Sequence, residues 1–557
     1  MITRLGAKRS AWNAADIRGE AEKLVASLGV IAEHAARAEL TEDLAVRAAA
    51  SCRPLLDRRD VPEHVRALTS PHVLAVEADL VASLAARAET PIEPAHRVRG
   101  IEHLDPAQQR VVTALAGDAG RHGGLLVIEG AAGTGKTTTL AAASQALDAR
   151  QRRLIVVTPT LKAAQVAHEQ IGADAFTAAW LVHQHGYRWD EDGRWTHTPI
   201  TRQEIAMSAR LMHDVFLVDE AGMLDQDTAR ALFAIADQSG AAIALLGDRH
   251  QLPAVGRGGV LDLAARWARP EAHLELESVH RFTDPAYADL SLFMRTGERP
   301  GEVFDTLLAR GEIVIHGSEV ERTATLAAIG AKPADHLVIA DTRDQRVGEQ
   351  TGERPGEPVT MAGERIGLGD RIATRRNDRD LGVANRDTWT VAGIGDDGSL
   401  LVIGRAGRQV QRELPKEYVD DYVELAYATT AYGAQGDTVD HAHLVIGETT
   451  GAAATYVGMT RGRNGNVAHL VAESIDDARR QWVDVFCRDR ADLGPAHAAT
   501  HAADDIDRYG PQAPQRQPAQ PSRSAALQAA LLGTTGVRRP REAPPITAPP
   551  PSRGVGR

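Results

Sequence analysis

The chain of 557 residues lacks long apolar runs, a secretory leader pattern and a cysteine framework. No apolar run approaches the ~20 residues that a membrane-spanning helix needs. The basic start MITRLGAKRSAWNAADIRGE has no apolar core of signal-peptide type. The two cysteines, Cys52 and Cys487, lie far apart, and their pairing stays open. Reduced thiols in a cytoplasmic protein without a membrane contact are the favoured interpretation.

Metal-ligand spacing is absent as well, and so is any internal repeat. The histidine pairs His183/His185 and His441/His443 have no third candidate ligand near them in the sequence. A structural metal site needs further ligands around such a pair. We therefore expect these residues to be ordinary structural or surface histidines.

The positive charge that would mark a general polyanion binder is missing, because the net charge is −12. The distribution is uneven, since from Arg508 onward eight arginines face a single acid, Glu542. This tail also holds ten of the 27 prolines, so we expect disorder from about residue 508. Any polyanion site on the folded body must be a local groove.

What the chain does contain is a change of pattern near Leu104. Residues up to about 97 are rich in Ala, Leu, Arg and Glu at helical spacing. Short apolar runs then alternate with helical stretches, among them LLVIEG (125–130), VFLVDEAG (215–222) and HLVIADT (336–342). Strands that are apolar on both faces indicate parallel sheets covered by helices on both sides. The sequence therefore predicts an α/β fold with two tandem domains.

The stretch EGAAGTGKTTTL (129–140) carries phosphate-binding chemistry. Its residues 130–137 fit the pattern G-x-x-x-x-G-K-[ST] in full, between a predicted strand and a predicted helix. Glycines let backbone N–H groups point at the phosphates of a nucleoside triphosphate, Lys136 reaches the phosphate oxygens, and the Thr137 hydroxyl coordinates Mg²⁺. The predicted nucleotide contacts of this loop are Gly130, Gly133, Thr134, Gly135, Lys136, Thr137 and Thr138.

Acidic and amide side chains follow two further apolar strands. Asp219 and Glu220 end a buried strand, where a carboxylate is costly unless it has a role such as holding Mg²⁺. Asp219 is thus a predicted metal contact, and Glu220 can orient or deprotonate an attacking water. In LLGDRHQLPAVGRGG (245–259), Gln251 can sense the terminal phosphate. A turn shaped by Gly247 and Pro253 is the structural alternative there.

Further motifs follow one another between about residues 104 and 473: LDPAQQRVV, VVTPTLKAAQVA, DEAG, GDRHQLP, ESVHRF, AYATTAYGAQGDTVD and YVGMTRGR. The set resembles superfamily 1 helicases of the RecD-like branch. That branch includes the helicase half of TrwC/TraI-type conjugative relaxases (MobF, TraA-like). So many motifs in one order make the resemblance specific.

The resemblance implies roles for further residues in an ATP site. Gln108 would read the adenine, Gly436 would contact the nucleotide, and Arg281 and Arg461 would act as arginine fingers at the γ-phosphate. The implied cofactors are ATP and Mg²⁺. The predicted catalytic residues are Lys136, Glu220, Gln251, Arg281 and Arg461.

The resemblance also implies a path for single-stranded DNA. Thr158, Pro159 and Thr160 would line it. Tyr432 stands where this branch often carries His, so its contact would be stacking on a base or a hydrogen bond.

Two predicted insertions offer additional contacts. YRWDEDGRWTH (187–197) predicts a β-hairpin, and related helicases have a duplex-splitting pin at this place. Trp189 and Trp195 either stack on a base or hold the hairpin against its domain. GDRIATRRNDRDLGVANRDTWTV resembles the start of an SH3-like domain. Its Arg375, Arg376 and Arg379 either touch DNA phosphates or form a solvated charged face.

The implied fold is two tandem RecA-like P-loop domains with a helical N-terminal domain, a small SH3-like β insertion and a disordered C-terminal tail. The expected bounds are 1–97 for the helical domain, 98–285 for the first motor domain with its hairpin at about 183–212, 286–355 and 423–485 for the second motor domain, 356–422 for the β insertion, and 486–557 for the C-terminal extension.

The expected function is an ATP-dependent DNA helicase or translocase on single-stranded DNA, of conjugative relaxase type, with 5′→3′ travel implied by the resemblance alone. The alternatives are a RecD-like repair helicase, a catalytically weak scaffold that binds single-stranded DNA, and a P-loop kinase or other NTPase. Expected partners are single-stranded DNA and duplex junctions, with conjugative transfer machinery or a separate nickase as further candidates, for a monomer. The nicking domain of full-length relaxases has no visible counterpart here, so DNA nicking is not predicted.

Overall fold

The structure is a computed structural model that describes residues 1–58, 60–90, 98–117, 124–211, 214–330, 336–340, 365–378, 380–404, 410–488 and 491–509. The predictions for Arg379 and for the tail beyond residue 509 lie outside the described residues. The chain divides into two compact units, Met1–Asp504 and Asp505–Arg557. The architecture below is that of the first unit.

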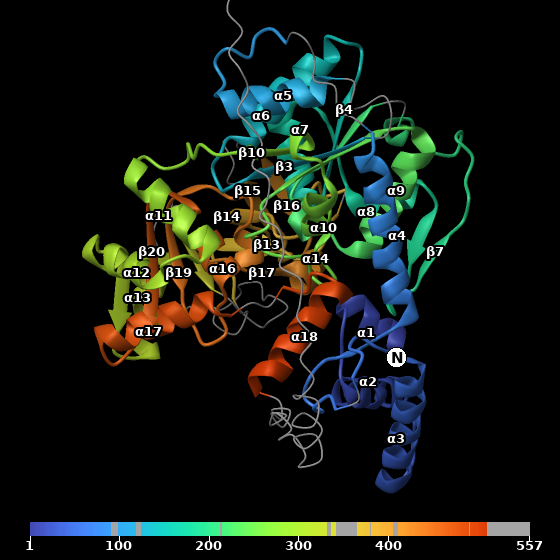
Figure 1. Cartoon of the computed structure of the whole chain (residues 1–557). Helices are drawn as coiled ribbons and strands as arrows, with labels where there is room; N and C mark the ends of the chain where they lie inside the picture. Colours follow the sequence, from blue (N-terminus) through green and yellow to red (C-terminus); the bar gives the residue numbers. More distant parts are fainter. Residues whose placement is uncertain are drawn as a thin grey trace, which may run out of the picture. The chain divides into compact units, whose positions relative to one another are not determined.

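A six-stranded sheet forms the centre of the first α/β domain (Figure 1). All of its neighbouring strands pair in parallel. The strand order is β10 (His273–Leu276), β3 (Leu125–Gly130), β9 (Ala242–Gly247), β8 (Val215–Val218), β4 (Leu154–Thr158) and β5 (Asp174–Thr177). The chain returns through a helix between parallel strands, as parallel pairing requires.

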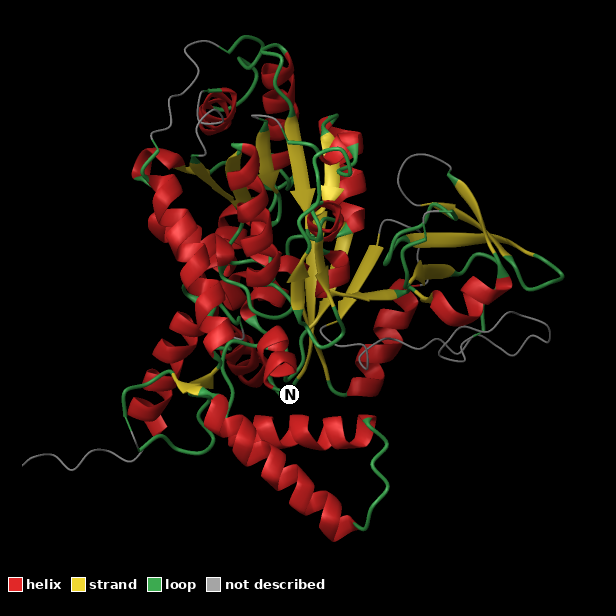
Figure 2. Ribbon diagram, turned by 90° about the vertical axis from the view of Figure 1, so that its right-hand side faces the viewer, coloured by secondary structure: helices red, strands yellow, loops and turns green. Residues whose placement is uncertain are grey.

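Helices cover both faces of this sheet (Figure 2). Alternate strand residues belong to the two cores on either side of it. Val127 and Phe216 face α4 (Pro71–Ala88), α8 (Ala178–Gln184), α9 (Gln226–Ser239) and α10 (Val260–Trp267). Ile128 and Leu217 face α5 (Pro106–Ala116), α6 (Lys136–Asp148) and α7 (Leu161–Ile171). Burial on both sides explains why these strands are apolar throughout.

A second, five-stranded parallel sheet forms the next domain. Its order is β11 (Ile313–His316), β20 (Gly462–Val471), β19 (Val439–Val445), β12 (His336–Ala340) and β18 (Ala428–Thr430). One face packs on α11 (Pro285–Thr296), α12 (Pro300–Ala309), α15 (Ala431–Ala434), α16 (Ala452–Gly458) and α17 (Ile475–Phe486), and the other on α13 (Glu319–Gly330). The two sheets resemble tandem RecA-like domains and confirm the predicted α/β fold class.

An antiparallel sheet lies in sequence between the strands of the second domain. Its order is β16 (Gln411–Leu414), β15 (Leu400–Gly404), β14 (Thr388–Ile394), β13 (Arg371–Thr374) and β17 (Val423–Leu425). With α14 (Lys416–Tyr422) it encloses a core of its own around Trp389, Val402 and Val419. The residue bounds of all the domains remain predictions.

The N-terminal helices divide between two cores. α1 (Ile2–Lys8), α2 (Ala14–Ser27) and α3 (His34–Ser51) share a small core with Trp12 and Cys52, beside the short pair β1 (Arg53–Pro54) and β2 (Leu68–Thr69). By contrast, α4 buries Val76, Leu80 and Leu84 in the core of the first α/β domain. α4 therefore packs as part of the first α/β domain, although its residues lie within the stretch 1–97 that the sequence predicts as a separate helical domain.

The predicted hairpin is present as β6 (Tyr187–Trp189) and β7 (Trp195–His197). Its turn lies against α1, where Arg4 Nε is 2.6 Å from Asp192 Oδ1. Gly193 has φ 76°, and a Cβ there would meet the Cβ of Ala7 at 2.3 Å. The Ala7 carbonyl also lies close to Gly256 in the loop after β9, because a Cβ on Gly256 would meet that oxygen at 3.1 Å. α1 therefore contacts both the hairpin turn and this loop.

The two hairpin tryptophans stack on each other, with ring centroids 4.9 Å apart. Trp195 packs against the core of the first domain, whereas Trp189 is 44% exposed. Packing therefore explains Trp195, and base stacking stays a prediction for Trp189.

Strand pairing in the second sheet aligns histidines from four strands. His316 Nε2 is 3.0 Å from His469 Nδ1, His469 Nε2 is 3.2 Å from His443 Nδ1, and His443 Nε2 is 3.2 Å from His336 Nδ1. His441 stacks on His336. Burial and the neighbouring histidines lower the pKa of His469 to about 3. The described residues contain no group arranged to hold a metal ion.

Cys52 is buried, Cys487 is exposed, and both are free thiols. Among the described residues, no helix combines the length and the apolar character required to cross a bilayer.

Candidate active site

The phosphate-loop sequence forms a tight turn from the end of β3 to the start of α6. Gly133 and Gly135 have φ 84° and 75°, in the left-handed region that glycine adopts without strain. A Cβ on Gly133 would meet the Cβ of Arg281 at 2.4 Å, and one on Gly135 would meet Gln108 Nε2 at 2.5 Å. Only glycine fits at both positions. The backbone therefore fits the phosphate cradle that the motif predicts.

Lys136 stands at the first position of α6, where the partial positive charge of the helix also favours an anion. Its Nζ donates to the carbonyl oxygen of Gly130 at 2.8 Å, so the amine lies inside the loop. Thr134 is buried and donates to the Ala131 carbonyl at 3.0 Å. Thr137 is half-buried and Thr138 is exposed in the first turn of α6.

Gln108 binds the loop from the outside. Its Nε2 donates to the Thr134 carbonyl at 3.2 Å, and its Oε1 accepts from the backbone N–H of Asp105 at 3.2 Å. Asp105 in return caps α5, which completes a capping box. The amide thus joins the start of α5 to the phosphate loop, and its reading of adenine stays a prediction.

The two predicted acids follow β8 directly. Burial and the adjacent Glu220 raise the pKa of Asp219 to about 7, while Lys136 acts in the opposite direction. Glu220 has φ 53°, a left-handed conformation that costs a non-glycine residue energy and recurs at functional sites. The two neighbouring carboxylates have different partners, because Asp219 Oδ1 accepts from the backbone N–H of Glu220 at 2.9 Å and Glu220 Oε2 lies 3.2 Å from Gln435 Nε2.

Gln435 from the second domain reaches the first-domain residues. Its Nε2 is 3.2 Å from Glu220 Oε2 and 3.5 Å from Gln251 Oε1. Gln251 also donates to Asp248 Oδ2 at 3.5 Å. Three loops that are far apart in the sequence therefore meet at Gln435.

The two predicted arginines lie at the junction of the domains. His280 N donates to the Gly133 carbonyl at 2.8 Å, which holds Arg281 against the phosphate loop, and Arg281 Nη1 donates to the Thr460 carbonyl at 2.6 Å. Arg461 is only 2% exposed, and its Nε donates to the Val457 carbonyl at 2.9 Å.

Burial lowers the pKa of both guanidiniums, and the charge of Arg461 adds to the effect on Arg281. Buried cations that repel each other are costly unless an anion compensates them. The pair therefore favours an anion beside the phosphate loop.

A tyrosine that sequence reasoning missed connects the domains at the same place. Tyr456 Oη accepts from the backbone N–H of Ala132 in the phosphate loop at 2.9 Å and donates to Asp248 Oδ2 at 3.0 Å. Arg295 Nε donates to Asp248 Oδ1 at 2.9 Å. Tyr456 opens the motif YVGMTRGR, so a signal for it existed. Arg295 lies outside every motif.

The structure contradicts one DNA contact that the resemblance implied. Thr158 is fully buried and donates its hydroxyl proton to the Thr160 carbonyl at 2.7 Å, so it cannot line a DNA path. Thr160 is exposed and caps α7. Tyr432 donates to the Pro253 carbonyl at 3.1 Å, a further bond between the two domains. Gly436 lies in the exposed loop between Gln435 and Asp437.

The arginines of the β insertion have partners within the protein. Arg375 Nη1 is 3.1 Å from Glu424 Oε1, and Arg376 stacks on the Tyr422 ring at 4.9 Å. Arg376 also donates to the Tyr422 hydroxyl at 2.8 Å. These contacts favour a structural role for both arginines.

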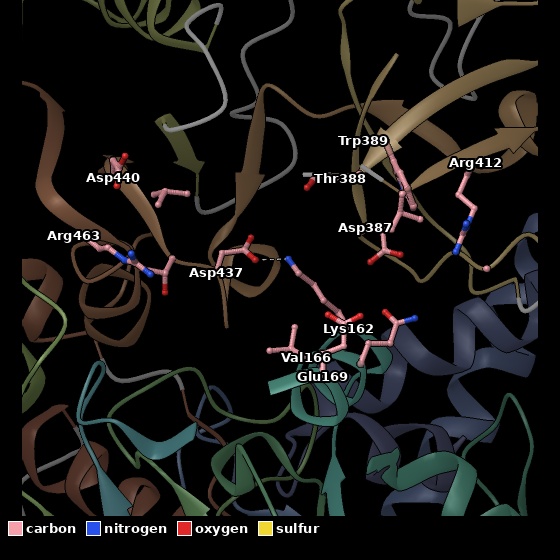
Figure 3. Close-up of a pocket in the computed structure, with 16 residues that line it drawn as sticks. Lys162, Val166, Glu169, Asp387, Thr388, Trp389, Arg412, Asp437, Asp440 and Arg463 are labelled. Carbon is pink, nitrogen blue, oxygen red and sulfur yellow. Dashed lines mark ion pairs between the residues drawn. The ribbon is translucent and has the colours of Figure 1, made fainter. Parts of the chain in front are cut away.

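A groove of about 680 Å³ lies where α7, the β insertion and residues 437–440 meet (Figure 3). Its lining includes Lys162, Trp389, Arg412 and Arg463. Lys162 Nζ is 2.6 Å from Asp437 Oδ1, which joins the first domain to the second across the groove.

The chain is similar in sequence to one known domain family and to two kinds of known protein. Residues 103–318 match the AAA domain family. The chain is 27% identical over 356 residues to the probable conjugal transfer protein TraA of Sinorhizobium fredii, covering 61% of this chain and 30% of that protein. It is 28% identical over 375 residues to the RecBCD enzyme subunit RecD of Mycolicibacterium smegmatis, covering 58% of this chain and 63% of that protein.

Among solved structures, the chain resembles the Pif1 helicase from Bacteroides in complex with ADP-AlF3 and ssDNA, with 17% identity and a TM-score of 0.46 over 73% of this chain and 98% of that one. The chain spans less than two thirds of the length of both TraA and RecD. The sequence relatives confirm the RecD-like resemblance.

Proposed function

We propose that this relative of RecD and of the TraA conjugal transfer proteins is an ATP-dependent DNA helicase that moves along single-stranded DNA. The observation that carries the proposal is the position of Arg281 against the phosphate loop, with Arg461 close enough for the two charges to interact. Arg281 is bound on one side to the loop through its neighbour His280 and on the other to Thr460 of the second domain. A triphosphate in the loop would supply the anion that both arginines need.

Different site residues act on the metal, on the phosphates and on the attacking water. ATP with Mg²⁺ supplies a cleavable phosphoanhydride bond, and Thr137 and Asp219 are the residues that would hold the metal. Lys136 and the backbone N–H groups of the loop bind phosphate oxygens. Glu220 receives a proton from the attacking water at its carboxylate, and Gln251 senses the terminal phosphate.

The arginines convert hydrolysis into movement of the domains. Neutralising the terminal phosphate from both sides favours a closed cleft, and loss of that phosphate removes the bridge. A strand held by both domains is then gripped in alternation. The direction, 5′→3′, rests on the resemblance to the RecD-like branch.

Two biological settings fit the relatives. TraA proteins are conjugal transfer proteins, and RecD is a subunit of the RecBCD enzyme. We favour transfer, with a nickase or transfer machinery as partner of a monomer in the cytoplasm. A scaffold without activity is disfavoured, because it has no need of the intact set of catalytic side chains.

The test is ATP hydrolysis measured with and without oligo(dT), followed by strand displacement on duplexes with a 5′ or a 3′ tail. The Lys136→Ala variant is the control for contaminating ATPase. We expect hydrolysis to be stimulated by the oligonucleotide and unwinding to require the 5′ tail. Absence of stimulation would contradict the motor function, and unwinding of the 3′-tailed duplex alone would contradict the direction.

A further inference from the structure

The groove and the ATP site are connected by one short loop, residues 435–439. Gln435 contacts Glu220 and Gln251, as described above. The main-chain oxygen of Asp437 lies 3.5 Å from Arg461 Nη1, and Val439 N donates to the Arg461 carbonyl at 3.1 Å. A displacement of this loop therefore moves the surroundings of Arg461 and Glu220 together.

The side chain of Asp437 faces the groove. There it forms the ion pair with Lys162 from the first turn of α7 (Figure 3). Both side chains are about a quarter exposed, at 24% for Lys162 and 26% for Asp437. A ligand in the groove can thus reach both members of the pair.

The charges of the groove favour competition for Lys162. Within the part of the chain that the structure describes, Arg412 and Arg463 line the groove and have no ion-pair partner. They can attract an anionic backbone locally, although the carboxylates of Glu169, Asp387, Asp437 and Asp440 line the same groove. Lys162 is held by Asp437 and also interacts with the carboxylate of Asp387. A phosphate drawn to the two arginines arrives beside a lysine that is already paired.

We propose that the Lys162–Asp437 ion pair couples the groove to the ATP site. A phosphate of single-stranded DNA replaces Asp437 as the ion-pair partner of Lys162. The 435–439 loop is then released from Lys162 and repositions Arg461 and Gln435 for hydrolysis. Lys162 is then a positioning residue, because it acts on the reaction through Asp437. This inference rests on the proposed function, since it concerns how DNA stimulates that ATPase.

The experiment compares the variants Lys162→Ala and Asp437→Asn with the wild type. Turnover of ATP is measured without DNA and with saturating oligo(dT), and the affinity for oligo(dT) is measured by fluorescence anisotropy at several salt concentrations. Both variants break the same pair, so both should raise the DNA-free rate about two- to five-fold and lower the stimulation ratio by the same factor. The double variant should add nothing, because the two substitutions remove one interaction.

The DNA affinities separate the two partners. Lys162→Ala should weaken binding and reduce the salt dependence by about one phosphate contact. Asp437→Asn should strengthen binding, because it frees Lys162. A purely structural role for the pair predicts the same direction of change in both variants.

Two controls keep the result interpretable. Lys162→Arg retains the charge and should restore a stimulation ratio near that of the wild type. Lys416→Ala removes a similar ion pair, with Asp420 at 2.8 Å on α14, from a residue that does not line the groove, and it should leave all measurements unchanged.

An unchanged stimulation ratio in both variants, or weakened DNA binding in both, would overturn the coupling while leaving the proposed function intact. A wild-type enzyme whose hydrolysis does not respond to oligo(dT) would overturn both.

Discussion

At the scale of single residues, Arg461 shows how a cationic side chain is held where water is excluded. The Arg461 guanidinium is almost fully buried, and its N–H groups bond to main-chain and hydroxyl oxygens rather than to a carboxylate. Such bonds hold the fork of the guanidinium in a defined orientation, while the carboxylates of Glu220, Asp437 and Asp248 offset part of its charge from further away. A cation that is held in one orientation by neutral oxygens is suited to bind a phosphate that arrives and leaves.

Replacing Arg461 by Ala should lower the turnover of ATP by about 10³-fold or more, because an arginine finger stabilises the transition state. Binding of a fluorescent ATP analogue should change little, since Lys136 and the loop remain. Arg461→Lys should not restore turnover, as an ammonium lacks the planar fork. Near-normal turnover in either variant would remove Arg461 from the mechanism.

Replacing Tyr456 by Phe should raise the KM for ATP by about one to two orders of magnitude. The substitution deletes the hydroxyl between Ala132 N and Asp248, which leaves buried polar groups unpaired. Tyr287→Phe is the matched control, because Tyr287 donates to the Met459 carbonyl at 2.7 Å within the second domain. Steady-state kinetics should show the change in KM for Tyr456→Phe alone.

At the scale of elements, the parallel pairing of β11, β20, β19 and β12 brings together side chains that the sequence holds far apart. A neutral imidazole has one donor and one acceptor nitrogen, so a chain of neutral rings can form a hydrogen bond at every link, whereas a charged ring has two donors and no acceptor. The four linked rings therefore make the second sheet sensitive to protons.

Acidification should destabilise this sheet. The folded-state pKa of His469 lies near 3, below the ordinary value of about 6.5, so below pH 6.5 the unfolded chain binds protons that the folded chain does not. Stability is then lost as the pH falls from about 6.5 towards 3, by about 1.4 kcal/mol per pH unit for each histidine kept neutral. Urea unfolding of the wild type and of His469→Gln at pH 7.5 and 5.5 measures the effect.

The variant should lose less stability on acidification than the wild type. His103→Gln, which changes an exposed histidine, should follow the wild type. An equal loss in all three proteins would show that other groups dominate the acid response.

The elements also show what the sequence can predict. The apolar run at 125–130 coincides with β3, and the described part of the run at 336–342 forms β12, because strands buried on both faces need continuous apolar residues. β10 and β5 went unpredicted, since each is short and carries polar residues. The hairpin was predicted from its turn residues, but its contact with α1 was not, because that contact depends on tertiary packing.

At the scale of the whole first unit, Met1–Asp504, the main feature is the number of bonds that cross between the two α/β domains. Arg281, Tyr432 and Lys162 each contribute one, and Tyr456 and Gln435 each contribute two. The phosphate loop, the acids and the arginines followed from motifs. The contacts of Tyr456, Arg295 and the Lys162–Asp437 pair did not, because only the way in which the domains meet creates them; of these residues, Arg295 alone stands outside the motifs.

A nucleotide held between the domains should stabilise the whole unit. A non-hydrolysable ATP analogue with Mg²⁺ should raise the midpoint of thermal unfolding, by linkage equivalent to about 2.7 kcal/mol at 100 times its Kd. Removing the metal with EDTA should abolish hydrolysis and most of the shift. Lys136→Ala should show no shift, whereas Arg461→Ala should retain much of it. A shift in Lys136→Ala as large as in the wild type would place the ligand elsewhere.

The position of α1 has a practical consequence for anyone working with this protein. Because Arg4 and Ala7 lie against the hairpin turn, and Ala7 also lies beside Gly256, a fusion partner or purification tag joined ahead of Met1 would emerge next to these loops. Bulk attached there should impair strand separation while ATP turnover continues.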